Sequence, residues 1–440
     1  MFRSKATTAL ALAAVALAAA TACTPSSPDK PVAPSAVEPS GSVELWHFFT
    51  DREEKAIETV IADFKAKYPK VDVVVKGGQD DTKMLQAIGA GQGPDVGLSY
   101  STDVAGQLCN SGAWIDLKPY VDRDKVDVGR YPETVRSYTQ FKGKRCAMPF
   151  LADAYGLYYN KAFFGEAGVT APPKTLSELS DLAKRLTKRK PDGTIERAGF
   201  LPLAGFYENS PSHMYPMVGA RWLKDDNTSA VGSDPAWQEL LRWQKELVDW
   251  FGYDKLEKFR ASLGDEWSAD NAFHKGQVAM MIDGEFRIAF LRDQAKDVQF
   301  GTAPVPVTRA ERYGAGYVTG NILGVSKTAK NPEAAWALVR YLSTDTAAIV
   351  KLANLIKNIP TTTEALASPG DLANDAEFKV FIDIFNNPHS VHMPSTAIGP
   401  ALEETMSDFM VKWQSGSAKD LEAGLRQVDE NIDKQLKLAS

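Results

Sequence analysis

The stretch GKRCAMPFLADAYGLYYNK, residues 143–161, decides the fold of this 440-residue chain. It passes from a basic, glycine-bearing start to Pro149, and a proline biases the backbone around it to an extended conformation. The apolar run that follows, with Tyr155, Tyr158 and Tyr159, predicts a strand. We interpret this strand as the crossing between two lobes, with a ligand cleft beside it. The alternative is an ordinary buried strand whose tyrosines pack in a core.

The composition is that of a globular protein with a substantial core. The hydrophobic fraction is 44% and the aromatic fraction is 10%, and the chain is long enough for two domains of ordinary size. The formal net charge is −6, which argues against a surface that binds nucleic acid or anionic membranes. No internal repeat is visible.

The N-terminus has the features of an export signal. Arg3 and Lys5 precede an alanine- and leucine-rich run, and polar chain follows it, so residues 1–22 are predicted to be a secretory signal peptide. Cys23 then resembles the lipidated cysteine of a bacterial lipobox, although this family usually has leucine three residues earlier, where this chain has Ala20. A soluble secreted protein, cut just before the cysteine, is the alternative.

Residues 23–41 are rich in proline and serine. Such a segment buries too little apolar area to offset the entropy lost on ordering, so we predict a disordered tether between a lipid anchor and the folded body. Beyond it the chain has two further cysteines, Cys109 and Cys146. In an exported protein they can form a disulfide, and two isolated buried thiols are the alternative; the sequence leaves both open.

The folded body opens with a β-α-β pattern. Residues 43–48 alternate as a strand does, residues 57–64 place their apolar side chains on one helix face, and residues 71–75 read as a second strand. Thr50 and Glu53 have the spacing of a capping box. Such a unit builds a mostly parallel sheet, whose ligands bind at the carboxyl ends of the strands. The fold class is therefore α/β.

Helix signals dominate the chain after the pivot strand. Thr175 and Glu178 form a second predicted capping box, and the pair Asp234-Pro235 opens a further helix. Two helical stretches, at about 401–413 and 418–437, close the chain.

Taken together, motifs along nearly the whole chain resemble a known family. They are VELWHFF, GQGPDV, SGAWIDL, KGKRCAMPF with LYYNKAFF, PPKTLSEL, FHKGQVAMMIDGEF and NILGVSKTAKNPEAAWALVRYL. In their order and spacing they resemble the extracellular solute-binding proteins of bacterial ABC importers, of the sugar-binding type related to maltose-binding protein.

The resemblance implies a two-lobed fold of the type II periplasmic-binding-protein kind, with a hinged ligand cleft. Lobe one is expected to comprise residues 42–149 and 303–345, and lobe two residues 150–302 and 346–440. The expected partners are a sugar and an ABC permease in the membrane. No cofactor, metal or nucleic acid is expected, and the protein is expected to be a monomer on the extracellular face of the cytoplasmic membrane.

A sugar site needs hydrogen-bonding groups for hydroxyls and flat rings for the C–H faces. The candidate ligand-binding residues lie at strand ends, at the pivot and in two loops: Trp46, His47, Gln79, Asp80, Asp153, Tyr155, Asp283, Glu285, Phe286 and Tyr317. Phe286 stands where the family often has tryptophan, and Tyr317 lies in a glycine-rich loop where the family commonly places an aromatic contact. Structural roles are the alternatives: Trp46 in the core, Asp80 as a helix cap, Asp283 in a turn. Tyr215 and Trp222 stay open between core and site.

Two other functions compete with sugar binding. A secreted glycoside hydrolase would use two carboxylates, for which Asp153 and Glu285 are candidates, but no G-x-S-x-G or H-E-x-x-H motif occurs. A binding protein for glycerol phosphate or another phosphorylated polyol would need cations in the cleft. Arg221 and Arg287 are the candidates for that role, and their acidic neighbours argue against it.

Overall fold

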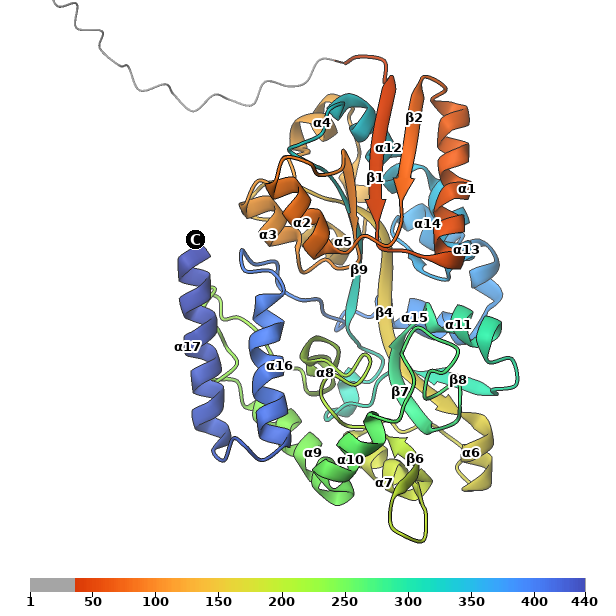
Figure 1. Ribbon diagram of the computed structural model, residues 1–440, viewed down its shortest axis with the longest axis vertical. Coiled ribbons are helices and arrows are strands. Elements are labelled where there is room, and N and C mark those ends of the chain that lie inside the picture. Colours follow the sequence, from red (N-terminus) through yellow and green to blue (C-terminus); the bar gives the residue numbers. More distant parts are fainter. Residues whose placement is uncertain (1–35, 440) are drawn as a thin grey trace, which may run out of the picture.

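A long strand, β4 (Met148–Asn160), runs through both lobes of the protein (Figure 1). Its first part pairs antiparallel with β9 (Val318–Val325). From Tyr155 onward it pairs antiparallel with β7 (Val278–Gly284) and β8 (Phe300–Ala303) instead. The predicted crossing strand between two lobes is therefore confirmed, and the change of partner at Tyr155 marks the waist of the molecule.

The computed structural model describes residues 36–439. The predicted signal peptide, the predicted lipidation site Cys23 and most of the predicted tether, residues 23–41, lie outside the described residues. Residues 36–40 have no regular secondary structure before the first strand begins. Within residues 36–439, no helix combines the length and the apolar character that crossing a membrane requires.

Lobe one contains the predicted β-α-β unit. β1 (Gly41–His47) lies between β2 (Val71–Lys76) and β3 (Val96–Ser99), and it is parallel to both. α1 (Asp51–Lys67) and α12 (Pro332–Thr344) bury their apolar faces against this sheet, because their apolar residues recur at the helical period. The sheet continues through β9 into β4, which joins it to the second lobe.

Lobe two continues the sheet in the order β4-β7-β6-β5. β6 (Ile195–Phe200) is parallel to β7, and the short β5 (Lys188–Arg189) pairs with β6 at the edge. α7 (Leu176–Leu186) begins with the predicted capping box of Thr175 and Glu178, which is confirmed. α9 (Pro235–Phe251) begins at the predicted Asp234-Pro235 pair.

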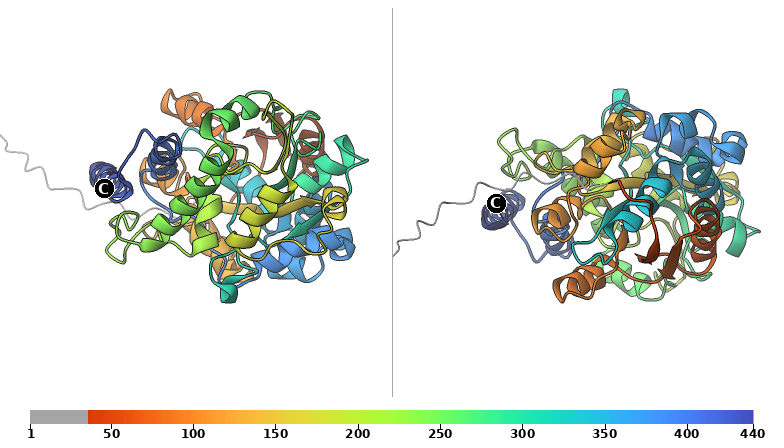
Figure 2. Two further views of the ribbon diagram at one scale, coloured as in Figure 1. Left: turned by 90° about the horizontal axis from the view of Figure 1, so that it is seen from below. Right: turned by 90° about the horizontal axis from the view of Figure 1, so that it is seen from above.

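The C-terminal part ends in α16 (Ala401–Gln414) and α17 (Leu421–Ala439), which confirm the two predicted closing helices. Figure 2 shows both helices on one side of the body in views from above and below. The remaining helices and strands are α2 (Asp81–Gly89), α3 (Ala105–Asn110), α4 (Lys118–Arg123), α5 (Glu133–Tyr138), α6 (Lys161–Glu166), α8 (Pro211–Val218), α10 (Tyr253–Arg260), α11 (Arg287–Gln294), α13 (Thr346–Ile356), β10 (Ile359–Pro360), α14 (Thr363–Ala367) and α15 (Ala376–Phe385), with 3₁₀ turns at Val128–Arg130, Ala310–Arg312 and Gly370–Asn374.

The capping box predicted for α1 does not form. Thr50 is the N-cap residue, but its side chain makes no capping hydrogen bond. Glu53 contacts the guanidinium of Arg52 instead, at 3.3 Å. Asp51 between them adopts a positive φ of 51°, which is uncommon for a residue with a side chain. Helix capping therefore does not explain the conformation of this turn. Its residues line the cavity described below.

The division between the lobes differs from the expected one in its last segment. Buried side chains of residues 348–385 share a core with β1, β3 and α1, and only from Met393 onward does the chain join the core of lobe two. α13 packs on α1, with an ion pair between Lys351 and Asp63, and β10 pairs with β4. Apolar periodicity showed that these helices bury one face, but not which core receives it. Nine buried residues of the expected segment 150–302 also belong to the first core: Phe150, Leu151, Ala152, Ala154, Tyr158, Phe273, Met281, Ile288 and Leu291.

Cys109 and Cys146 form a disulfide, with their Cα atoms 5.4 Å apart. Cys109 lies on α3, and Cys146 lies in the segment that leads into β4. Both side chains belong to the core of lobe one, so the bridge joins two parts of the same lobe. The question that the sequence left open is thus answered in favour of the disulfide.

Candidate functional site

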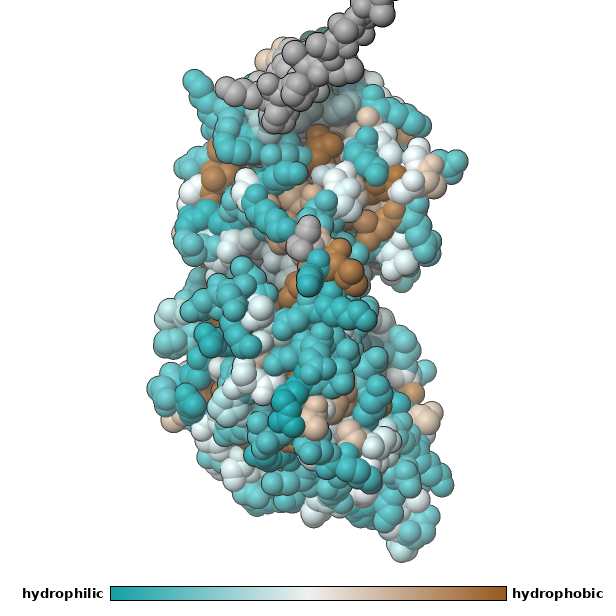
Figure 3. Space-filling view, turned by 90° about the vertical axis from the view of Figure 1, so that its left-hand side faces the viewer, coloured by the Kyte–Doolittle hydropathy of each residue, from teal (hydrophilic) through white to brown (hydrophobic). Residues whose placement is uncertain are grey.

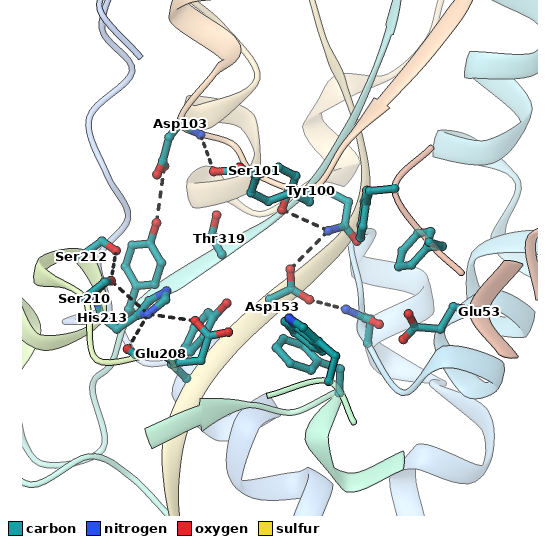
Figure 4. A pocket seen from close by; sticks show the side chains of 18 of the residues that line it. Glu53, Tyr100, Ser101, Asp103, Asp153, Glu208, Ser210, Ser212, His213 and Thr319 are labelled. Atoms are coloured by element: carbon teal, nitrogen blue, oxygen red, sulfur yellow. Dashed lines mark hydrogen bonds and ion pairs between the residues drawn. The ribbon is translucent and has the colours of Figure 1, made fainter. Parts of the chain in front are cut away.

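A cavity of about 1000 Å³ lies between the two lobes beside β4 (Figure 4). Lobe one contributes the turn Phe48–Glu53 after β1 and residues Tyr100–Asp103 after β3. Lobe two contributes residues around the start of α8, the loop that carries Trp267, and the first half of α16. Seen from the side of α17, the surface is mostly hydrophilic and its outline narrows between the lobes (Figure 3). Chain segments far apart in the sequence thus meet at one site.

Four of the predicted ligand-binding residues line this cavity: Asp153, Tyr155, Phe286 and Tyr317. The ring of Tyr155 is the centre of their packing. It stacks on His213 at 3.9 Å between ring centroids, lies 5.6 Å from the ring of Tyr317, and meets Phe286 edge-on at 6.3 Å. Tyr155 lies on β4 and His213 on α8, while Phe286 follows β7 and Tyr317 precedes β9. Aromatic rings from four chain segments therefore meet at β4.

Trp46 and His47, predicted at the end of the first strand, do not line the cavity. The indole Nε1 of Trp46 donates to Glu44, and the ammonium of Lys76 lies 5.4 Å from its ring. His47 is fully buried, and this burial lowers the pKa of its imidazole to about 4. The prediction placed the cleft at the end of the strand itself, whereas the chain reaches the cavity with the turn that begins at Phe48.

Gln79 and Asp80, predicted at the end of the second strand, also lie outside the cavity lining. The amide of Gln79 donates to the backbone carbonyl of Gly77 at 2.9 Å. The carboxylate of Asp80 accepts from the backbone N–H of Lys83 at 2.8 Å and caps α2. The helix-cap alternative for Asp80 is therefore confirmed, because this side chain satisfies a free N–H of the first turn.

Asp283 and Glu285 lie behind the cavity wall and are fully buried. The guanidinium of Arg287, itself fully buried, donates to Asp283 at 2.6 Å and contacts Glu266 at 3.3 Å. Glu285 accepts from the backbone N–H of Ala154 at 2.8 Å, next to Asp153 on β4. Both predicted residues therefore hold the wall in place and are not among the groups that face the cavity.

Nine acidic side chains line the cavity, against Arg52 and His213 as the basic ones: Asp51, Glu53, Asp103, Asp153, Glu208, Asp293, Glu403, Glu404 and Asp408. Burial raises the pKa of Glu53 to about 7 and that of Asp153 to about 6. Burial, followed by the charge of Glu403, raises the pKa of Asp103 to about 7. Burial thus favours the protonated forms of these three carboxyl groups.

Glu208 and His213 contact each other at 3.2 Å between Oε2 and Nδ1 (Figure 4). Burial raises the pKa of Glu208 well above its usual range and lowers the pKa of His213. Both shifts favour the uncharged forms, so this contact joins two neutral groups and is not an ion pair. Glu208, Glu266 and Asp283 also bring ligand atoms within 4.8 Å of one another, which is a metal-like spacing, but Arg287 already contacts two of these three residues.

Residues 50–349 match the family of bacterial extracellular solute-binding proteins. The chain belongs to this family. Its curated relatives include a maltotriose-binding protein of Pyrococcus abyssi, which is 24% identical over 410 residues, covering 90% of this chain and 83% of the relative. Among solved structures, one described as CpMnBP1 with mannotriose bound is 26% identical, with a TM-score of 0.81 over 89% of this chain and 99% of its own.

Another solved structure that resembles the chain is the GacH receptor of Streptomyces glaucescens GLA.O, described in the unliganded form and in complex with acarbose and an acarbose homolog. It is 25% identical, with a TM-score of 0.74, and the alignment covers 91% of this chain and 100% of that one. These neighbours confirm the two-lobed type II binding-protein fold.

Sequence reasoning missed several residues of this cavity, including Tyr100, Asp103, Trp267 and Glu403. Tyr100 and Trp267 are 50% and 49% exposed, the two most exposed rings among the lining residues. Trp267 had a usable signal, since it stands in the polar stretch GDEWSADN with no apolar neighbour to make a core. Tyr215 and Trp222, left open from sequence, are buried in the core of lobe two and do not line the cavity.

Proposed function

We propose that this chain is the carbohydrate-binding component of an ABC importer, which holds a sugar between its lobes and delivers it to a membrane permease. The observation that carries the proposal is the cavity itself, because it combines exposed aromatic rings with many carboxylate and amide acceptors. Rings pack on the C–H faces of a sugar, and acceptors bind its hydroxyls. Sugar-bound relatives of the same fold support this assignment.

Lobe closure is the proposed route to delivery. Tyr100 belongs to lobe one and Trp267 to lobe two, so a sugar that stacks on both would hold the lobes together. β4 passes through both lobes and changes its pairing partners at Tyr155, which makes this point the natural hinge. A ligand that contacts both lobes stabilises the closed form in proportion to the contacts made only in that form.

The cavity disfavours a phosphorylated ligand. Arg287, one of the two cations considered for such a ligand, is fully buried and bound to Asp283 and Glu266. Arg221, the other one, has a side chain that is 63% exposed and is absent from the cavity lining. A phosphate would instead face the acidic side chains of the cavity, which repel it.

The pair of carboxylates considered for glycoside hydrolysis is also poorly placed. A hydrolase needs two carboxyl groups that flank the scissile bond. Asp153 lines the cavity, but Glu285 is fully buried behind the wall, bound to the backbone of Ala154. We therefore propose binding without chemical change, and a ligand recovered in altered form after incubation with the protein would contradict this.

A thermal-shift screen tests the proposed function. The full-length protein is heated with mono-, di- and oligosaccharides and with glycerol phosphates. A ligand bound only by the folded state raises the Tm. At a hundredfold excess over Kd it adds about 2.7 kcal/mol to the free energy of unfolding. We expect a rise with at least one saccharide and none with the glycerol phosphates. A rise confined to the glycerol phosphates would reverse the choice between the two ligands.

Removal of either aromatic anchor should weaken the sugar identified by that screen. Truncating a central anchor costs about 2 kcal/mol or more, so Phe286→Ala and Trp267→Ala should each raise the Kd by roughly 30-fold. Trp46→Ala is the matched control, since Trp46 lies outside the cavity lining, and its Kd should stay near that of the wild type. Calorimetric titration measures all three. If both anchor variants bind the sugar with wild-type affinity, the sugar does not stack on these two rings and the proposed site is wrong.

We also propose that Cys23 carries a lipid that holds the protein at the extracellular face of the cytoplasmic membrane, in reach of its permease. The position of Cys23 directly after the alanine-rich run motivates the proposal. Cys23→Ala should leave the precursor unlipidated and largely uncleaved, in contrast to the wild type. Membrane fractionation and the size of the chain report the outcome; an unchanged distribution for Cys23→Ala would favour the soluble secreted form.

A further inference from the structure

Most of the acidic side chains that line the cavity have no basic side chain of the lining beside them. Of the two basic residues in the lining, Arg52 is bound to Glu53 and Asp293, at 3.3 Å in each case. His213 adds no charge, because burial lowers the pKa of its imidazole. Arg287 lies behind the wall and is bound to carboxylates there. The protein supplies no further cation among the lining residues, so a cation carried by the solute would balance those carboxylates that remain charged.

Two of the unbalanced carboxylates come from opposite lobes. Asp103 follows β3 in lobe one and accepts from the hydroxyl of Tyr317 at 3.4 Å (Figure 4). Glu403 lies on α16 in lobe two and accepts from the N–H and the hydroxyl of Ser212, at 3.1 and 2.6 Å. The charge of Glu403 helps to raise the pKa of Asp103, so the two groups repel each other across the cavity. A cation between them would turn this repulsion into attraction.

Two buried acceptors in the lining of the cavity have no hydrogen-bond partner. Asn321 and Asn358 line the cavity, and the Nδ2 of each donates to Asp153. The Oδ1 of each accepts no hydrogen bond, although the residues are only 4% and 3% exposed. A hydroxyl offers one donor and also needs donors for its own lone pairs, whereas an ammonium offers three donors and needs none.

We propose that the solute of this site is a saccharide that bears a free amino group, and that its ammonium lies between Asp103 and Glu403. This inference rests on the proposed sugar-binding function and narrows it to one chemical class. The ammonium makes charge-assisted hydrogen bonds to a carboxylate of each lobe, so it couples binding to closure. The exposed rings of Tyr100 and Trp267 stack on the sugar and attract its positive charge.

Matched ligands test the charge. The full-length protein is titrated by calorimetry with a β-1,4-linked glucosamine trisaccharide and with kanamycin A. The controls are cellotriose, which has a hydroxyl in place of each amine of the trisaccharide, and the N-acetylated form of each probe. We expect at least one amine probe to bind about 30-fold or more tightly than its neutral counterparts. This preference should shrink as salt is added.

Binding of the neutral forms as tightly as the amines, or no binding of either amine probe, would overturn the inference. The proposed function is judged separately, because a neutral saccharide that raises the Tm in the thermal-shift screen would keep it while this inference fails. If no saccharide of either kind raises the Tm, both fail.

Charge-neutral variants locate the ammonium. Asp103→Asn and Glu403→Gln keep the size of each side chain and remove its charge, and each should weaken the amine probe by at least about 10-fold. Neutral saccharides should lose little in the same variants. Glu239→Gln, on the exposed face of α9 and outside the cavity lining, is the matched control. Wild-type affinity for the amine probe in both cavity variants would place the ammonium elsewhere and contradict the assignment.

Discussion

Replacing Arg287 with methionine should lower the free energy of unfolding by about 3–5 kcal/mol. The guanidinium is fully buried and is the cation that contacts Asp283 and Glu266, at 2.6 and 3.3 Å. Methionine fills a similar volume without charge, so the variant leaves buried carboxylates uncompensated in the wall of the cavity. Urea denaturation of the wild type and the variant measures the loss.

Arg221→Met is the matched control for this prediction. The side chain of Arg221 is 63% exposed, and its contact with Asp225 spans 3.8 Å at the surface. An exposed ion pair contributes about 0–1 kcal/mol, so the control should unfold close to the wild type. A similar small change for both variants would mean that the carboxylates behind the wall do not depend on the cation.

The destabilisation of Arg287→Met should also diminish as the pH falls. Burial raises the pKa of Asp283, and it raises the pKa of Glu266 to about 7, while Arg287 opposes both shifts. Without the guanidinium these pKa values rise further above those of the unfolded chain. The folded variant then binds more protons than the unfolded one, so its stability increases as the pH falls through these raised pKa values towards those of the unfolded carboxyl groups. Unfolding at pH 7.5 and pH 5 shows whether the gap to the wild type narrows.

Breaking the disulfide is the second change with a large expected effect. Cys109 and Cys146 are 37 residues apart in sequence. Cross-linking a loop of this length removes entropy from the unfolded chain, which is worth about 2–4 kcal/mol. Cys146→Ser should therefore reduce the free energy of unfolding by that amount. Because both cysteines lie in the core of lobe one, the affinity for the solute should change little.

Reductant supplies the control for the disulfide. Adding dithiothreitol to the wild type should lower its stability to that of Cys146→Ser, and it should leave the variant unchanged. A wild type that is as stable reduced as oxidised would show that the bridge contributes little, and an equal response of both proteins would show that reductant acts elsewhere.

Local patterns in the sequence determined the elements of the fold. The alternation of residues 43–48 and the helical period of residues 57–64 predicted β1 and α1 correctly, because each depends on neighbours within a few residues. The aromatic stretch after Pro149 likewise predicted β4, and the order of motifs predicted the family. Among the residues that line the cavity, Asp153 and Tyr155 on β4 were found for the same reason.

The walls of the cavity were decided only by the tertiary structure. Asp103 and Glu403 are 300 positions apart in the numbering, and no periodicity relates them; they share a cavity because β3 ends there and α16 begins there. The prediction for Trp46 was wrong because the first residue after β1 that lines the cavity is Phe48, two positions later. The alternating pattern of a strand does not show where a cavity begins. A pattern states which face of an element is buried, whereas the partner of that face depends on how all elements pack.

The same reason explains the misassigned segment between α13 and α15. The buried faces of these helices were visible in the sequence, but apolar side chains pack equally well on either core, since hydrophobic burial has no direction. The pairing of β10 with β4 and the contact of α13 with α1 place them in lobe one. Arg287 is a further case: from the sequence it was a candidate cation in the cleft for a phosphorylated ligand, whereas the structure buries it against Asp283 and Glu266.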